Sequence, residues 1–312
     1  MPAILAIHGG AGTMRRDSMT PDAEAAFHAG LRWALMAGHA VLKAGGSALD
    51  AVTQAVVALE DDPLFNAGHG AVYTSAGKHE LDAAVMNGAA REAGAVAGIL
   101  GPRNPILAAR AVLASEHVML HGRGAEDFCR DAGVAFAPAA HFHTNRRWEA
   151  LLAEVKRRRQ TAEDTRDDAA KHGTVGAVAC DAMGHVAAAT STGGMTGKAP
   201  GRIGDCPVFG AGTWADDSSC AISATGHGEF FIRYAAAHEI ACRMRYLGES
   251  VEQAAEIVVT GLGAIGGSGG LIAVDALGNV SLPFNSAGMY RGAIGEDGVP
   301  RTAIYREALR KG

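Results

Sequence analysis

Short apolar runs and stretches of helical periodicity alternate along the 312 residues of this chain. The apolar runs end at glycine, asparagine or aspartate, which is typical of strands that enter turns. Expected strands cover residues 3–7, 81–86, 95–100, 118–120, 174–180, 185–190, 208–210, 220–223, 271–274 and 280–282. Expected helices cover residues 21–43, 48–59, 125–132, 147–158, 229–245 and 250–259, and another begins at 105.

Two of the turns share the pattern Asp-Ala-x-Gly, at residues 181–184 and 275–278. Such tight turns join antiparallel strands, and the helices between them need an apolar face on which to pack. The expected fold class is therefore α+β, a four-layer αββα sandwich. The first half of the chain has too few strands to close a sheet alone, so residues 1–312 are expected to form one domain.

A charged stretch separates the two halves of the chain. Ten of the sixteen residues from Lys156 to Lys171 are charged, and alanine is the apolar residue type among them. Such a segment cannot bury a core face. We expect an exposed, mobile linker over about 156–173.

Composition excludes several classes of protein. Hydrophobic residues make up 48% of the chain and its formal net charge is −5, so it is neither disordered nor a basic nucleic-acid binder. No apolar run reaches the 18 or so residues of a membrane span, and the apolar start stops at His8, too early for a signal peptide. The five cysteines are widely spaced, which favours buried thiols in a reducing cytoplasm over disulfides or structural zinc. The 42 glycines stand out, because glycine is costly inside regular elements.

Three motifs suggest chemistry that their context does not support. Gly266-x-Ser268-x-Gly270 has the spacing of a nucleophile elbow, but here a helix precedes it and a strand follows, the reverse of the required order. Residues 193–199 resemble a phosphate loop, yet alanine stands where the magnesium-binding hydroxyl belongs. His141 and His143 lack a third metal ligand nearby in the sequence.

Thr174 has a more informative setting, because it starts a strand directly after Gly173 and the charged linker. Threonine is common at strand starts, so taken alone the position is unremarkable. If the Gly173–Thr174 bond were cleaved, however, the hydroxyl of Thr174 would have its own α-amine as a base. An α-amine has a pKa of about 7.7–8.0, which suits a general base near neutral pH. Gly173 would leave the attacked carbonyl unhindered.

The residues around Thr174 also resemble a known family, the plant-type L-asparaginases or isoaspartyl peptidases, which are N-terminal-nucleophile hydrolases. The resemblance covers nearly the whole chain. It is carried by residues 8–12, 65–68, 80–83, 172–178, 189–195, 200–205, 224–229, 266–270 and 283–285. It implies self-cleavage between Gly173 and Thr174, giving an α subunit (1–173) and a β subunit (174–312) that stay together, and pairing of two such units into an (αβ)2 oligomer.

The resemblance implies a role for each residue of the reacting centre. Thr174 is the nucleophile and, through its amine, the base. Thr192 bonds the hydroxyl of Thr174, and Asn66 bonds its ammonium group. Thr225 and the amide of Gly226 stabilise the oxyanion, a task for which a hydroxyl and an unhindered N–H are suited.

Three further residues are implied to bind the substrate. Arg202 holds its α-carboxylate, for which a planar bidentate group is well shaped. Asp205 pairs with its α-ammonium, and the backbone of Gly228 contacts the same amine. The family also holds a structural sodium ion through backbone carbonyls, which map here to Leu59, Glu60, Asp62, Phe65, Ala67 and His69. No organic cofactor is implied.

The expected function is therefore that of a self-processing amidohydrolase. It would convert L-asparagine to L-aspartate and ammonia, and hydrolyse β-aspartyl dipeptides, through a threonyl acyl-enzyme. The expected partners are these small molecules or dipeptides, with no nucleic acid and no membrane. Two alternatives stay open at this point: a glycosylasparaginase acting on sugar-linked asparagine, and a non-catalytic glycine-rich binding protein whose chain stays intact.

Overall fold

Strands from both sides of Gly173 interleave in one large sheet of the computed structural model, which describes residues 3–12, 14, 16–160 and 173–311. The strand order is β13-β12-β11-β1-β5-β6-β2-β3-β4. Its strands are β1 (Ile4–Gly12), β2 (Leu81–Asn87), β3 (Glu92–Ile99), β4 (Met119–His121), β5 (Val175–Cys180), β6 (Val186–Thr192), β11 (Gly288–Ile294), β12 (Arg301–Ala303) and β13 (Arg310–Lys311). The strand that follows Thr174 thus lies at the centre of the sheet, between β1 and β6.

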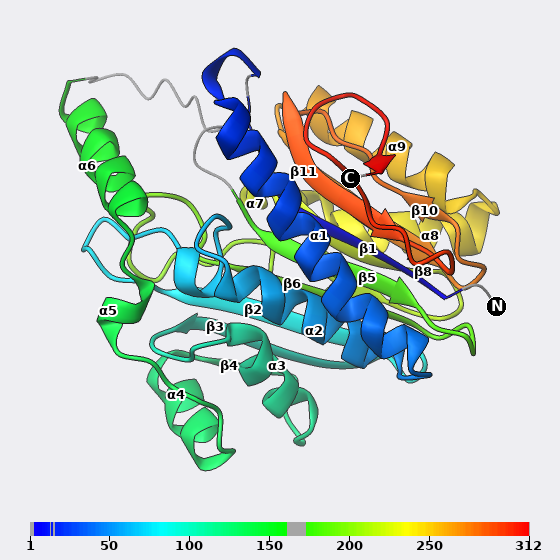
Figure 1. Cartoon of the computed structure of the whole chain (residues 1–312). Helices are drawn as coiled ribbons and strands as arrows, with labels where there is room; N and C mark the ends of the chain where they lie inside the picture. The colour runs from blue at the N-terminus through cyan, green and yellow to red at the C-terminus, as the bar shows by residue number, and fades with distance from the viewer. Residues whose placement is uncertain (1–2, 13, 15, 161–172, 312) are drawn as a thin grey trace.

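A second, antiparallel sheet has the order β10-β9-β8-β7 and faces the first. Its strands are β7 (Thr213–Ala215), β8 (Cys220–Gly226), β9 (Gly269–Asp275) and β10 (Val280–Ser281). Helices cover the two outer faces: α1 (Pro21–Lys43), α2 (Ala48–Asp61) and α3 (Pro105–Leu113) on the large sheet, and α8 (Ala236–Leu247) and α9 (Val251–Ala264) on the small one (Figure 1). The layers run helix, sheet, sheet, helix, which confirms the predicted αββα sandwich.

Each pair of adjacent layers has its own apolar core. Leu31, Leu35 and Val56 belong to the core between the first helices and the large sheet, and Ile240 and Val258 to the core under α8 and α9. The core between the two sheets combines alanines such as Ala6 and Ala188 with larger residues such as Met86 and Ile272. Small side chains allow the two sheets to approach closely.

Local sequence signals explain the best predicted elements. Thr20 accepts a hydrogen bond from the backbone of Ala23 at the start of α1, and Ser47 does the same for Asp50 in α2. In both Asp-Ala-x-Gly turns, one aspartate oxygen accepts two backbone N–H groups of the turn. These bonds fix the turns locally, whatever the rest of the chain does.

Several boundaries differ from the expectation. β1 continues through the glycines to Gly12 with a bulge between His8 and Gly10, instead of ending at residue 7. Residues 208–210 form turns, not a strand. The helix expected over 229–245 is two helices, α7 (Gly228–Tyr234) and α8, separated by Ala235 in a left-handed conformation. β7, β11, β12 and β13 were not predicted, and neither was the short helix at Ala139–Phe142.

The prediction of an exposed linker over about 156–173 is wrong for residues 156–160. Helix α6 (Asn145–Gln160) continues through residues 156–160, because Glu154 forms ion pairs with Arg157 and Arg158 along its last turns. Residues 161–172 lie outside the described part of the chain. Two other helices, α4 (Gly122–Asp131) and α5 (Ala139–Phe142), precede α6.

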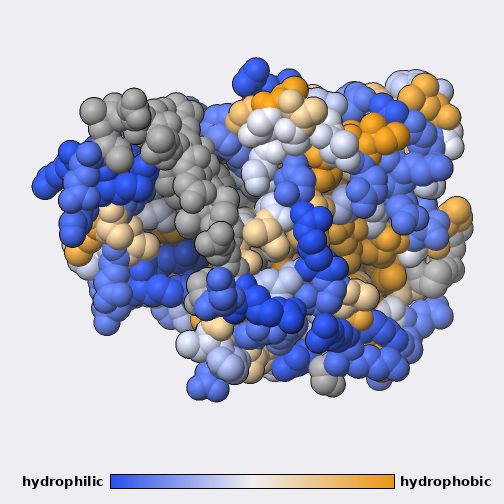
Figure 2. Space-filling model, turned by 90° about the horizontal axis from the view of Figure 1, so that it is seen from above, coloured by the Kyte–Doolittle hydropathy of each residue, from blue (hydrophilic) through white to orange (hydrophobic). Residues whose placement is uncertain are grey.

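Among the described residues, no helix combines the length and the hydropathy that a membrane span needs. Seen from above, hydrophilic residues alternate with smaller hydrophobic patches (Figure 2).

Candidate active site

Thr174 lies at the centre of the large sheet, one residue before β5 begins. Its side chain is buried, and its hydroxyl donates to Oγ1 of Thr192 at 3.2 Å. Gly173 packs against the bulge of β1: a side-chain carbon on Gly10 would lie 2.6 Å from Cα of Gly173, and Gly10 has a φ of +110°. Glycine is therefore needed at position 10 for the bulge to reach the bond before Thr174.

Thr192 and Asn66 form the floor beside this hydroxyl. Oγ1 of Thr192 also accepts the backbone N–H of Gly194 at 2.9 Å. The amide of Asn66 donates to the carbonyl of Gly194 at 2.7 Å and accepts the N–H of Val72 at 2.9 Å. Asn66 also lies against Gly173, where an added side-chain carbon would be 3.0 Å from Cβ of Asn66. The structure thus places Asn66 beside Gly173, with its amide engaged in holding the 192–194 turn.

Thr225 and Gly226 end strand β8 near the same bulge. Oγ1 of Thr225 accepts the N–H of Ala11 at 3.1 Å. Because that lone pair is occupied, the hydroxyl proton of Thr225 is directed elsewhere and can serve as a donor. Gly226 has a φ of +152° and packs against Gly269, where a side chain would clash.

Arg202 holds a two-pronged ion pair with Glu229, which sits in the first turn of α7. Nε and Nη2 of Arg202 donate to the two oxygens of Glu229, both at 3.0 Å. Burial would raise the pKa of Glu229, but its hydrogen bonds and charge pairing with Arg202 lower it overall. A guanidinium has a second bidentate edge, Nη1 and Nη2, which is the edge open to a second carboxylate.

Asp205 is a buried carboxylate whose Oδ2 has no hydrogen-bond partner among the described residues. Burial raises its pKa to about 7, against the opposing charge of Arg202. Gly228 lies against both groups: a side-chain carbon there would be 2.7 Å from Oδ1 of Asp205 and 3.1 Å from Nη2 of Arg202. An unpartnered buried carboxylate beside an arginine and a bare backbone suits a ligand that carries both an ammonium and a carboxylate.

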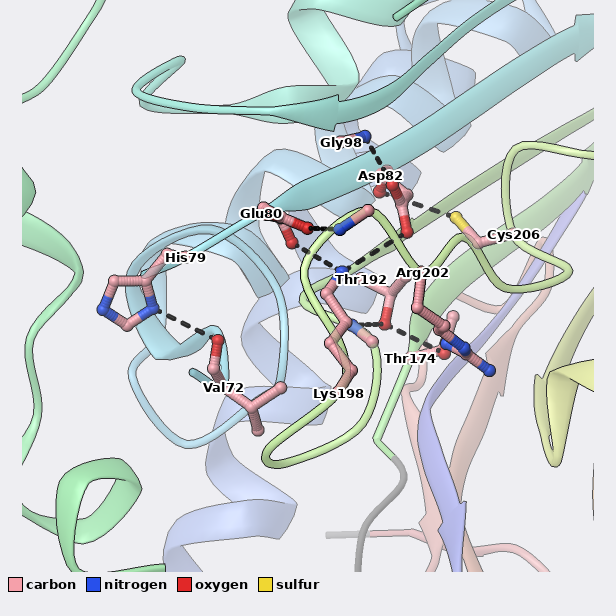
Figure 3. A network of polar contacts seen from close by, with 12 residues as sticks. Val72, His79, Glu80, Asp82, Gly98, Thr174, Thr192, Lys198, Arg202 and Cys206 are labelled. Atoms are coloured by element: carbon pink, nitrogen blue, oxygen red, sulfur yellow. Dashed lines mark hydrogen bonds and ion pairs between the residues drawn. The ribbon is translucent and has the colours of Figure 1, made fainter. Parts of the chain in front are cut away.

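Sequence reasoning missed a buried ion pair next to this site. Lys198, the lysine of the phosphate-loop-like stretch, is fully buried, and its ammonium lies 3.8 Å from Oδ2 of Asp82. The ammonium donates to the carbonyl of Glu80 at 2.9 Å (Figure 3). Its stem packs against Gly194. Asp82 pairs with Thr192 across β2 and β6. Lys198 therefore supports the 192–194 turn, and no feature of the sequence pattern predicted this role.

The other two weak motifs have structural roles. The backbone of Ser268 accepts the N–H of His227, and the glycines after it start β9, so a helix precedes and a strand follows as expected. His141 stacks on His69, and Nδ1 of His143 bonds the hydroxyl of Tyr73 at 2.6 Å. No metal-binding cluster of His, Cys, Asp and Glu occurs within the described ranges.

The loop expected to hold sodium folds around two glycines of the 3-10 turn η2 (Gly68–Gly70). A side-chain carbon on Gly68 would lie 2.6 Å from the carbonyl oxygen of Glu60. One on Gly70 would lie 2.0 Å from the carbonyl oxygen of Phe65 and 2.7 Å from that of Pro63. Backbone carbonyl oxygens of this loop thus lie against the bare backbone of both glycines. Carbonyl oxygens are among the ligands that a hard cation takes.

Glu229 offers a direct test of the arginine geometry. If it orients Arg202 for a substrate carboxylate, Glu229→Gln is expected to raise the KM for asparagine about 3- to 10-fold, because one charge-assisted contact at a half-exposed carboxylate is lost. The matched control is Glu249→Gln, which alters the same two-pronged arrangement on Arg243 in α8 and should leave KM unchanged. A lower KM in Glu229→Gln would mean that Glu229 competes with the substrate instead.

Comparisons with known proteins cover the stretch of the chain that holds all of these residues. The family model described as asparaginase matches residues 1–304. An isoaspartyl peptidase of Salmonella typhimurium is 51% identical over 98% of this chain and 99% of its own length. A plant-type L-asparaginase of Thermococcus kodakarensis is 41% identical, covering 92% and 94%. An isoaspartyl peptidase/L-asparaginase of Xenopus laevis is 38% identical, covering 95% and 94%.

Proposed function

The chain belongs to the asparaginase family, and we propose that it hydrolyses L-asparagine and β-aspartyl dipeptides through an ester on Thr174. The observation that carries this proposal is that Arg202 and the buried carboxylate of Asp205 both lie against the bare backbone of Gly228, while Oδ2 of Asp205 has no hydrogen-bond partner among the described residues. In a β-aspartyl amide the scissile bond is formed by the side-chain carbonyl. The α-carbon therefore keeps both a free carboxylate and a free ammonium group. The names of the relatives agree with this substrate class.

The first reaction we propose is self-cleavage. Oγ1 of Thr174 attacks the carbonyl carbon of Gly173, the C–N bond breaks, and the proton of the hydroxyl passes to the departing nitrogen. The acyl group has then moved from nitrogen to oxygen, and water hydrolyses the resulting ester. The products are a carboxylate on Gly173, the free hydroxyl of Thr174 and its new α-amine. Gly173 favours the attack because it bears no side chain.

The second reaction uses the new amine as the base. It takes the proton of Oγ1 as the oxygen attacks the β-carbonyl carbon of the substrate. The hydroxyl of Thr225 and the N–H of Gly226 are the donors for the oxyanion, and the N–H of Ala11 keeps the Thr225 proton available for it. The amine's proton is passed to the leaving nitrogen, which departs as ammonia or an amino acid. Water then hydrolyses the β-aspartyl ester to release aspartate.

We also propose that the carbonyls of Glu60 and Phe65, with others of the 59–69 loop, hold a sodium ion. The carbonyl of Glu60 lies close to Gly68 and that of Phe65 close to Gly70, which supports this. The ion would stiffen the loop that carries Asn66, and it takes no part in the bond-breaking steps. The pairing of two units and a cytoplasmic location stay predictions.

A substrate panel tests the proposed reaction. β-Aspartyl-leucine and L-asparagine are expected to release aspartate, while α-aspartyl-leucine is not. In the α-linked peptide the α-carboxylate is consumed in the peptide bond, so Arg202 has no carboxylate to bind. The expected discrimination is at least about 100-fold in kcat/KM, measured by aspartate release. Comparable cleavage of the two dipeptides would contradict the proposed substrate class. A sugar-linked asparagine belongs in the same panel, and a preference for it would favour the glycosylasparaginase alternative.

A further inference from the structure

A chain of polar side chains crosses the interior between the two sheets and ends on the backbone of Thr174. His8 on β1 contacts the carbonyl of Thr174 through Nδ1 at 3.0 Å and Oγ of Ser223 through Nε2 at 2.9 Å. The contacts continue from Ser223 to Thr190 at 2.7 Å, and from Thr190 to Thr213 at 2.7 Å. Oγ1 of Thr213 also lies 2.9 Å from the carbonyl oxygen of Cys206. All four side chains are fully buried.

Counting protons shows that this chain has a direction. It has five contacts, and both of its ends are carbonyl oxygens, which only accept. A neutral histidine and three hydroxyls supply four protons, one fewer than the contacts require. An imidazolium would supply the fifth proton. The charge state of His8 therefore decides how every hydroxyl in the chain points.

The surroundings of His8 favour the neutral form. Burial lowers the pKa of His8 to about 3, and the carbonyl of Thr174 opposes this shift only in part. In the described part of the chain, no charged side chain contributes to that shift. With the Thr174 carbonyl as acceptor, the single ring proton belongs on Nδ1. Ser223 then donates to Nε2 and Thr190 donates to Ser223, while Thr213 has one proton for its two acceptors, Oγ1 of Thr190 and the carbonyl of Cys206.

Strand β5, which follows Thr174, leaves space for the contact between His8 and Ser223. A side-chain carbon on Gly176 would lie 1.9 Å from Oγ of Ser223 and 2.5 Å from Nε2 of His8. Even alanine at this position would push the two groups apart. Gly176 therefore serves the contact between His8 and Ser223, although they are 215 residues apart in the sequence.

We propose that His8, as the neutral tautomer protonated at Nδ1, is a positioning residue for Thr174, with Ser223 as the donor that orients its ring. The proposal rests on the proposed function. Thr174 immediately precedes the first paired residue of β5. Cleavage of the Gly173–Thr174 bond would make Thr174 the first residue of a new chain. The bond from His8 holds its carbonyl while Thr192 contacts its hydroxyl, and together the two fix the new amine relative to Oγ1.

Neutron diffraction on the deuterium-exchanged wild-type enzyme at neutral pH tests the arrangement without any substitution. Deuterium is expected on Nδ1 of His8 and not on Nε2, with the hydroxyl of Ser223 directed at Nε2. Deuterium on both ring nitrogens, or on Nε2 alone, would overturn the proposal. This result does not depend on whether Thr174 is the nucleophile, so its failure is distinguishable from failure of the proposed function.

Two variants test the positioning role in solution. In His8→Asn the amide nitrogen can occupy the place of Nδ1, whereas in His8→Gln it can occupy only the place of Nε2. We expect His8→Asn to keep a kcat at least about tenfold above that of His8→Gln, with similar KM values, because the substrate clamp is untouched. Equal kcat values in two folded variants, or a loss confined to KM, would overturn the positioning role.

Discussion

Thr174→Ala is expected to remain a single chain of 31.9 kDa on a denaturing gel, while the wild-type enzyme gives bands of about 18 and 14 kDa for residues 1–173 and 174–312. The variant lacks the oxygen that attacks Gly173, so the N-to-O shift has no acceptor atom. It is also expected to lose activity on β-aspartyl-leucine by at least about 10³-fold, because both the nucleophile and the amine that activates it are absent.

Two further variants separate chemistry from folding. Thr174→Ser keeps a hydroxyl in the same place and is expected to give two bands and measurable activity. Thr53→Ala removes another buried threonine, whose hydroxyl donates to the carbonyl of Leu49 within α2, and should process normally. A processed, active Thr174→Ala protein would show that the nucleophile has been misidentified. A wild-type chain that stays unprocessed and is nevertheless active would contradict only the self-cleavage step.

The parts of the fold that the sequence predicts well are those determined by neighbours in the chain. The N-caps Thr20 and Ser47 and the aspartates of the two hairpin turns all bond backbone groups within four residues. Such signals can be read from a short window because the partner is always near. The helices α1 and α2 and the hairpin between β5 and β6 follow from them.

The elements that were wrongly predicted are set by distant contacts. The helical pattern continues through Ala235, yet the helix breaks there because the next amides bond elsewhere: those of Ala237 and His238 donate to the carbonyls of Ala211 and Gly210. Residues 208–210 also take part in turn contacts: Gly210 accepts one of these bonds, and the carbonyl of Val208 accepts the N–H groups of Ala211 and Gly212. A short sequence window cannot show that a segment so far along the chain will accept these amides.

The residues of the site differ in the same way in how well the sequence predicts them. Thr174 was identifiable because a glycine, a strand start and a charged stretch stand together in the sequence. Arg202 and Asp205 were assigned only through the family resemblance of residues 200–205. His8 and Lys198 could not be assigned, because their partners come from other strands and their burial depends on the finished sandwich. The glycines partly bridge this gap: Gly10, Gly176 and Gly228 each mark a position where a side chain would displace a site residue.

Asp205→Asn is expected to raise the KM for L-asparagine by at least about 30-fold, with a much smaller change in kcat. Removing one partner of a buried charge pair costs about 2–5 kcal/mol, or roughly 30- to 5,000-fold. Because the ammonium is bound equally in the ground state and the transition state, the loss falls on KM. The neutral amide is nearly the same shape, so Gly228 and Arg202 keep their packing.

The pH dependence of KM gives the same prediction a second readout. Burial raises the pKa of Asp205 to about 7, so in the free enzyme its carboxyl is protonated below that pH and cannot attract an ammonium. KM in the wild-type enzyme should therefore rise as the pH falls through 7, and this rise should vanish in Asp205→Asn. The matched control is Asp181→Asn, a buried aspartate in the hairpin turn at the far end of β5, which should keep the wild-type profile. If Asp205→Asn retained the wild-type KM and its pH dependence, the ammonium would have to bind elsewhere, and the orientation assigned to the substrate between Arg202 and Asp205 would be wrong.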